Sequence, residues 1–254
     1  MLQRYFVRNE QIVGDHVMIS GDDVHHIGRV MRMNEGDRLL CCNERSETML
    51  CEIEQISNDF VRCRIIQWIE ANVELPVHVY VASGLLKGDK YELVLQKGTE
   101  LGAKGFLPLI TSRSIVKWDE KKGDKKVERW QKIVKEAAEQ SHRAYMPSVC
   151  APMTIRELIA WARDINYKYI AYEEEAKEGR HRSFAHLLQT MSKEDSLLIV
   201  FGPEGGLSEQ EVALLKEHGF VACSLGPRIL RAETAPLYAL SAVSYEWELK
   251  STTQ

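Results

Sequence analysis

Two glycine-rich segments near the end of the sequence contain the residue types from which ligand-binding loops are built. The first, LIVFGPEGGLSEQE at residues 198–211, is an apolar run that stops at a Gly-Pro step and leads into an S-x-x-E helix-start pattern. The second, at residues 223–241, repeats this order, and its Gly226 lies 24 residues after Gly202. Such loops expose backbone donors and acceptors next to a rigid turn, which suits them to reading the edge of a heterocycle.

Phosphate is a poor ligand for these loops. A P-loop requires G-x-x-x-x-G-K-[ST], whereas Leu207 stands five residues after Gly202 and no lysine follows it. Glu204 would also place a carboxylate beside the anion, and no G-x-G-x-x-G fingerprint follows a predicted strand. A turn that only connects two elements is the alternative for a single Gly-Pro loop, but a pair of them favours a site.

From Pro76 onward, apolar runs of strand length alternate with amphipathic stretches of helix length. This alternation is typical of an α/β domain with a mostly parallel sheet and helices on both faces, and its loops open where ligands bind. Strands are predicted at residues 76–83, 106–110, 168–173, 197–201 and 221–226. Helices are predicted at residues 90–103, 127–144, 154–163, 183–191, 208–219 and 237–249, the last of them capped by Thr234.

Residues 1–72 have a different pattern, in which short predicted strands are separated by turn signals such as NEGD and SND. Within residues 21–37, Val24, Ile27 and Met31 recur at i, i+3 and i+7 and predict one short helix. We therefore expect a small β-barrel that carries one helix. The resulting prediction is two domains, at residues 1–72 and 73–254, joined near residues 70–76.

Composition excludes several classes of protein. The N-terminal segment lacks the apolar core of a signal peptide, and no apolar run approaches the ~20 residues of a membrane span, so a cytoplasmic location is expected. The six cysteines form no C-x-x-C pair and are expected to be reduced, buried and without a metal. A net charge of −4 with local basic segments is compatible with a specific nucleic-acid partner.

Six segments together are similar to the RsmE family of SPOUT methyltransferases, which methylate N3 of a uridine in 16S rRNA. They are RYFV, HHIGRVMRMNEGD, KGDKYELVLQKGTELGA, WQKIVKEAAEQSHR, FGPEGGLS and LGPRILRAETAPLYALS. The resemblance spans nearly the whole chain and implies a PUA-like first domain, a homodimer, and a C-terminal trefoil knot that holds S-adenosylmethionine. Its implied cofactor-binding residues are Phe201, Gly202, Pro203, Glu204, Gly205, Gly206, Leu225, Gly226, Ile229, Leu230 and Thr234.

Methylation at N3 requires that a weakly acidic imide lose its proton and that the resulting charge be stabilised. In the matched loops Arg231 is the candidate for holding the base or its phosphate. Glu233 or Glu204 is the candidate for accepting or relaying the proton. The alternative role for Arg231 and Glu233 is an ion pair that braces the loop.

RNA contacts are expected from two helices and from the first strand. His25, Arg29 and Arg32 fall at i, i+4 and i+7, on a face separate from the apolar stripe. The adjacent histidines 25 and 26 point apart on a helix, so a metal site is not expected. On the helix that ends near residue 143, the outward residues include two that match the family's EQSxR motif. The RNA-binding candidates are Arg8, His25, Arg29, Arg32, Gln140 and Arg143.

The sequence alone leaves two other functions open. A non-catalytic RNA-binding assembly factor for the ribosome could use the same barrel and basic faces. A small-molecule α/β enzyme that uses a nucleotide could use the same loops. The final helix, apolar nearly all round, must be covered either by the core or by a second copy of the chain.

Overall fold

The computed structural model describes residues 2–70, 73–116, 118, 120–172 and 184–250. The expected strand end at 173 and helix start at 183 lie outside these residues. The chain divides into two compact units, the first made of residues 1–74 and 138–146 and the second of residues 75–137 and 147–254. Residues 138–146, at the end of a long helix and just beyond it, are thus grouped with the first unit although they come much later in the chain.

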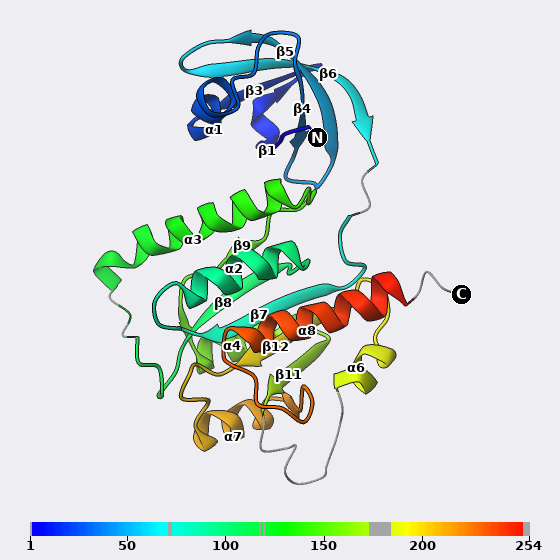
Figure 1. Cartoon of the computed structure of the whole chain (residues 1–254). Coiled ribbons are helices and arrows are strands. Elements are labelled where there is room, and N and C mark those ends of the chain that lie inside the picture. The colour runs from blue at the N-terminus through cyan, green and yellow to red at the C-terminus, as the bar shows by residue number, and fades with distance from the viewer. Residues whose placement is uncertain (1, 71–72, 117, 119, 173–183, 251–254) are drawn as a thin grey trace. The chain divides into compact units, whose positions relative to one another are not determined.

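The first unit is built on a curled six-stranded sheet (Figure 1). Neighbouring strands are antiparallel except for the parallel pair of β1 and β4. In spatial order the strands are β1 (Arg4–Phe6), β4 (Arg38–Cys42), β5 (Thr48–Ile56), β6 (Phe60–Ile69), β3 (His16–Ser20) and β2 (Ile12–Val13).

Alternating side chains explain why this sheet curls around one core. Along β6, Val61 and Cys63 are buried while Arg62 and Arg64 are exposed, which is the period of two expected of a half-buried strand. The six cysteines are free thiols, five of them buried and Cys150 half-buried, so they serve as small hydrophobic residues as expected.

The short helix of this unit is less regular than its sequence predicts. Helix α1 (Asp22–His25) continues as one turn of π-helix (His26–Val30), and Val24 and Ile27 are buried. The expectation that Met31 extends the buried stripe is wrong, because its side chain is 37% exposed. Arg32 has a φ of 52° and has left the helix, so it does not continue the helical face that carries Arg29.

The second unit contains the predicted parallel sheet. It has seven strands, and every pairing in it is parallel. The spatial order is β10 (Met153–Thr154), β8 (Gly105–Ile110), β7 (His78–Gly84), β12 (Ser196–Phe201), β11 (Tyr167–Ala171) and β13 (Val221–Cys223), and β9 (Ser148–Val149) pairs with β8.

Helices cover both faces of this sheet (Figure 1). Along β12, Ile199 and Phe201 point to one core, whereas Leu198 and Val200 point to the other. The nearly continuous apolar run of the strand is the pattern of a parallel strand buried on both sides. The first core is covered by α2 (Lys90–Glu100), α3 (Glu120–Gln140), α6 (Phe184–Thr190) and α8 (Thr234–Ser244), and the second by α4 (Ile155–Trp161) and α7 (Glu209–Glu217).

Helix α8 is only partly covered within the chain. Leu240 and Val243 are fully buried, but Tyr238, Tyr245 and Leu249 are 41%, 58% and 62% exposed. The last two belong to a turn of π-helix (Tyr245–Leu249) that follows α8. These three side chains lie at i, i+7 and i+11 and therefore form one apolar stripe on the outer face.

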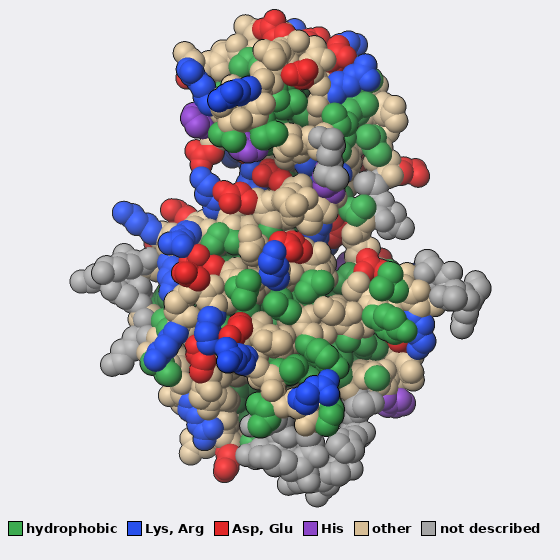
Figure 2. Space-filling view, viewed as in Figure 1, with side chains coloured by type: hydrophobic (Ala, Val, Ile, Leu, Met, Phe, Trp, Pro, Cys, Tyr) green, Lys and Arg blue, Asp and Glu red, His purple; other side chains and the backbone are tan. Residues whose placement is uncertain are grey.

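No helix among the described residues is long and apolar enough to cross a membrane. On the face shown in Figure 2, Lys and Arg side chains are interspersed with Asp and Glu. This mixture agrees with a net charge of only −4. Any recognition of an anionic polymer therefore depends on local groups of basic residues rather than on the overall charge.

Candidate functional site

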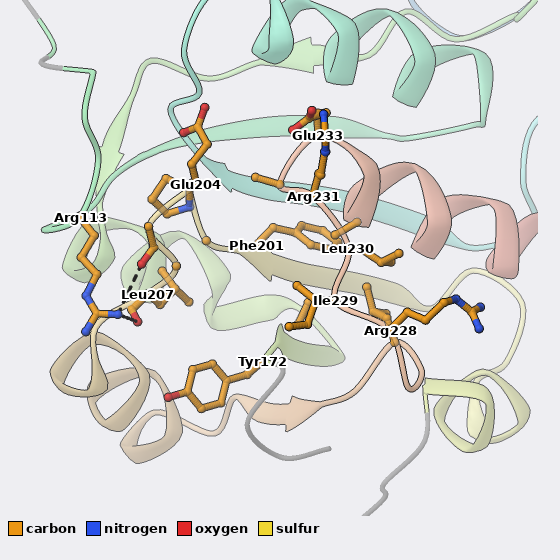
Figure 3. Close-up of a pocket in the computed structure, with 18 of the residues that line it drawn as sticks. Arg113, Tyr172, Phe201, Glu204, Leu207, Arg228, Ile229, Leu230, Arg231 and Glu233 are labelled. Atoms are coloured by element: carbon orange, nitrogen blue, oxygen red, sulfur yellow. Dashed lines mark hydrogen bonds between the residues drawn. The ribbon is translucent and has the colours of Figure 1, made fainter. Parts of the chain in front are cut away.

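A cavity of about 570 Å³ opens at the carboxyl edge of the parallel sheet (Figure 3). It is walled mainly by the loops that follow β12 and β13, with further residues after β7, β8 and β11. In a parallel sheet these strand ends share one edge, which is where α/β folds bind ligands. Its lining residues are 90, 113, 171–172, 201–207, 224–226, 228–233 and 235.

The first Gly-Pro loop, between β12 and α7, is folded tightly on itself. A Cβ at Gly202 would lie 2.8 Å from the backbone carbon of Gly206 and from the backbone nitrogen of Leu207. Gly206 has a φ of 69°, in the region that favours glycine, and its N–H donates to the carbonyl of Pro203. The glycines at these positions are therefore required by the loop itself, apart from any ligand.

The predicted capping box after this loop is confirmed, and its carboxylate also binds Ser112 in the loop that follows β8. The Ser208 hydroxyl accepts from the Glu211 N–H, and the Glu211 carboxylate accepts from the Ser208 N–H at 2.8 Å. The same carboxylate accepts from the Ser112 N–H at 2.7 Å and from its hydroxyl at 3.1 Å. Burial raises the pKa of Glu211, but these hydrogen bonds outweigh it and lower the pKa below its usual value.

We expect Glu211→Gln to destabilise the protein by about 1–2 kcal/mol at pH 7, because the amide cannot accept all of these hydrogen bonds. A carboxyl group with a lowered folded-state pKa stabilises the fold above its unfolded pKa of ~4.3 and loses this contribution as the pH falls through the folded value. The free-energy gap between wild type and variant, measured by urea unfolding, should therefore narrow in acid. The exposed Glu209→Gln in the same helical turn is the control, and an equal loss there would contradict this role.

The second Gly-Pro loop, between β13 and α8, is more open. The Ser224 hydroxyl accepts from the Gly226 N–H at 3.1 Å and donates to the Gly226 carbonyl, and Gly226 has a φ of 129°. Ile229 leaves 78% of its surface exposed while it lines the cavity.

The two loops do not follow adjacent strands, since β11 lies between β12 and β13. Tyr172, which follows β11, accordingly lines the cavity as well.

Acidic and basic side chains meet at one part of the cavity. The Lys90 ammonium lies 3.4 Å from Glu233 Oε2 and 3.8 Å from Glu204 Oε1. A hydrogen bond from its own backbone N–H is the largest cause that lowers the pKa of Glu233, and Lys90 and Arg231 add to it against partial desolvation. The Glu233 carboxyl is therefore ionised at neutral pH.

Arg113 braces the first loop from outside. Its guanidinium donates to the carbonyls of Gly205 at 3.4 Å and Leu207 at 3.2 Å. A Cβ at Gly205 would approach the Arg113 carbonyl at 3.1 Å, so the two backbones also lie close together. The segment after β8 thereby fixes the outer rim of the cavity.

Comparisons of the sequence with family models and with known proteins identify the family of this chain. A family model described as an RNA methyltransferase domain matches residues 73–244, and a model described as an RNA methyltransferase PUA domain matches residues 19–66. The chain is 51% identical over 251 residues to the ribosomal RNA small subunit methyltransferase E of Bacillus subtilis (strain 168), covering 98% of each chain. It belongs to this RNA methyltransferase family.

Solved structures of similar proteins have the same fold over nearly the whole chain. A putative methyltransferase from Legionella pneumophila, in complex with S-adenosylmethionine, is 32% identical with a TM-score of 0.83 and covers 96% of this chain and 97% of its own. The ribosomal RNA small subunit methyltransferase E from Neisseria gonorrhoeae, bound to S-adenosylmethionine, is 28% identical with a TM-score of 0.84, covering 97% and 98%.

Of the cofactor-binding residues that the resemblance to this RNA methyltransferase family implies, all but one line the cavity. Thr234 does not line the cavity and does not cap α8 either, since Glu233 is the preceding residue and no side chain caps the helix. Sequence reasoning missed Lys90, Arg113 and Tyr172. Lys90 begins α2, and Arg113 and Tyr172 follow the ends of β8 and β11 within three residues. Once the strand order is known, such positions indicate residues at the carboxyl edge of the sheet.

The six RNA-binding candidates lie in the first unit, but they are not equally accessible. Arg8, His25, Arg29, Arg32 and Gln140 are exposed. Among the described residues, no group of three or more His, Cys, Asp or Glu side chains could hold a metal ion.

The expectation that Arg143 points outward is wrong. Its side chain is buried, and its Nε donates to Glu74 Oε2 at 3.1 Å. The other carboxylate oxygen of Glu74 accepts from the N–H groups of Ala144 and Tyr145, and Arg4 donates to the Arg143 carbonyl at 2.9 Å. A charge this deeply buried needs such partners, so a direct RNA contact by Arg143 would require this network to open.

Proposed function

We propose that the protein transfers the methyl group of S-adenosylmethionine to N3 of a specific uridine in 16S rRNA. The observation that carries this proposal is the cavity at the carboxyl edge, walled by two Gly-Pro loops, in a chain of this RNA methyltransferase family. The similar proteins from Legionella and Neisseria are described as bound to S-adenosylmethionine. The Bacillus relative is named as a small-subunit rRNA methyltransferase.

The residues of the cavity fit this cofactor. Ile229, with 78% of its surface exposed, together with Leu225 and Leu230 offers apolar faces for an adenine ring. The absence of a Cβ at Gly226, where only the Tyr238 hydroxyl would lie within 4 Å, leaves backbone groups open to the edge of the ring. When bound, S-adenosylmethionine supplies a methyl group activated on a sulfonium. The Glu204 and Glu233 carboxylates are compatible with this cation and disfavour a phosphate group.

Arg231 and Glu233 are the residues we assign to the reaction. Arg231 is exposed within the cavity lining, where its guanidinium can stabilise negative charge on the pyrimidine oxygens as N3 loses its proton. Within the part of the chain that the structure describes, Glu233 forms its ion pair with Lys90 and not with Arg231. This favours an RNA-directed role for Arg231 over a bracing ion pair. Glu233, or the exposed Glu204, is proposed to accept or relay the proton.

The first unit, which we equate with a PUA-like domain over residues 1–72, is proposed to bind RNA. Arg8, His25, Arg29 and Arg32 are exposed there and can contact phosphates or bases. Gln140 is an exposed candidate from the end of α3. Residues 73–254 are proposed to form the SPOUT domain that binds the cofactor, and its matching family model begins at residue 73.

A trefoil knot, a homodimer and a cytoplasmic location complete the proposal. The knot is supported by the order in which β12 lies between β7 and β11, with both Gly-Pro loops at one cavity. The dimer is supported by the exposed stripe of Tyr238 on α8 and of Tyr245 and Leu249 on the π-helical turn after it, which a second copy would cover. A crystal structure with an unthreaded C-terminal segment, or a monomer in sedimentation equilibrium, would contradict these points.

The function is tested by mapping methylated nucleotides in rRNA by mass spectrometry, in cells with and without the protein. We expect one 3-methyluridine in 16S rRNA to disappear with the gene and to return with the wild-type protein. Calorimetry with S-adenosylmethionine separates the alternatives, since a non-catalytic assembly factor would show no heat of binding. A small-molecule enzyme would stay active without residues 1–72, whereas an enzyme that captures RNA through them would not.

A further inference from the structure

The two loops that wall the cavity are not held equally to the rest of the unit. The first loop is anchored to the segment between β7 and α2, because the Lys87 N–H donates to Glu204 Oε1 at 3.1 Å. A Cβ at Gly84, at the end of β7, would lie 2.6 Å from Pro203 Cδ, so these backbones are in contact. Arg113 holds the same loop from its other side.

The second loop has a charged link to that same segment through Lys90. This lysine is the first residue of α2, and it lines the cavity. Its Nζ lies 3.4 Å from Glu233 on the second loop and 3.8 Å from Glu204 on the first. The Glu233 side chain is only 13% exposed, so its charge is poorly solvated and depends on the ammonium group more than a surface carboxylate would.

We propose that Lys90 is a positioning residue that ties the two cofactor loops together through its ion pairs with Glu204 and Glu233. The proposal rests on the proposed cofactor site, but it concerns the loops and makes no claim about the RNA. Loss of the ammonium group should loosen the second loop more than the first, because the first keeps its contacts with Gly84, Lys87 and Arg113. The cavity would then hold S-adenosylmethionine less tightly.

The test compares Lys90→Met with Lys97→Met in the full chain. Lys97 lies on the same helix and forms an ion pair with Glu100 at 2.8 Å, away from the cavity lining. Lys90→Met should weaken S-adenosylmethionine binding about tenfold in calorimetry, the scale expected for losing two partly exposed ion pairs. Lys97→Met should leave the Kd within about twofold of wild type. Lys90→Arg should restore most of the affinity, since it keeps the charge.

A double-mutant cycle identifies the partner. If Lys90 acts through Glu233, adding Lys90→Met to Glu233→Gln should weaken binding by much less than it does in the wild-type background. Fully additive effects would overturn this part of the proposal. Circular dichroism and thermal unfolding of each variant exclude a folding defect as the cause.

Hydrogen exchange of the ligand-free protein decides the proposal independently of the cofactor. In Lys90→Met, amides of residues 226–233 should exchange at least about threefold faster, with a smaller change in residues 202–207. Equal exchange in Lys90→Met and Lys97→Met would overturn the positioning role. If the wild type bound no S-adenosylmethionine, the proposed function would fail, while the exchange result would still decide whether Lys90 links the loops.

Discussion

Arg231→Ala is expected to lower the rate of RNA methylation by about 100- to 1,000-fold, the effect of removing one group that stabilises developing charge. Folding and S-adenosylmethionine affinity should change little. The guanidinium belongs to an exposed residue of the cavity lining, and Glu233, the carboxylate whose pKa it helps to lower, keeps its ion pair with Lys90 at 3.4 Å. The variant should have a lower kcat, because the guanidinium is needed mainly when negative charge develops on the pyrimidine. Single-turnover methylation of 16S rRNA fragments or assembled small subunits measures it.

Arg228→Ala supplies the matched comparison for this result. Arg228 is three residues away on the same loop, but its guanidinium points away from Arg231 and Glu233 (Figure 3). We expect its loss of rate to be at least about tenfold smaller than that of Arg231→Ala. If Arg231→Ala weakened cofactor binding and the rate in parallel, the residue would be a brace of the loop and not part of the reaction.

Gly202→Ala is expected to weaken S-adenosylmethionine binding by at least about tenfold, because returning the displaced loop to its binding geometry would cost on the order of 1.4 kcal/mol or more. The new methyl group would meet backbone atoms of Gly206 and Leu207 at 2.8 Å. Backbone atoms cannot swing aside as the end of a side chain can, so the loop must shift. Overpacking of this kind costs about 1–3 kcal/mol, and urea unfolding should show this loss together with the weaker binding measured by calorimetry.

Gly28→Ala is the control for a change from glycine to alanine. A Cβ there would have only Ile56 Cγ2 nearby, at 3.8 Å, which is an ordinary contact. Its stability and cofactor affinity should match those of the wild type. Unchanged affinity in Gly202→Ala would show that the first loop tolerates a shift and does not shape the cofactor site.

Local patterns in the sequence predicted the features that depend on neighbouring residues. The Ser208 and Glu211 capping box is present as predicted, and so is the parallel sheet with helices on both faces. These two predictions succeed because the hydrogen bonds at a helix start, and the pattern of apolar runs that marks strands and helices, depend on residues close together in the sequence. The short helix at Val24 was predicted too regular, because one turn of π-helix and the positive φ of Arg32 break its period.

Residue types and spacing were enough to locate the two glycine loops, to disfavour phosphate as their ligand, and to indicate the family to which the chain is similar. Three features became visible only in the folded chain: β11 lies between the two loop-bearing strands, Lys90 reaches both loops, and Arg143 is buried against Glu74. Glu74 and Arg143 are 69 residues apart in the chain, and Lys90 and Glu233 are further apart still. Contacts at such separations depend on strand order and helix packing, which local periodicity does not encode.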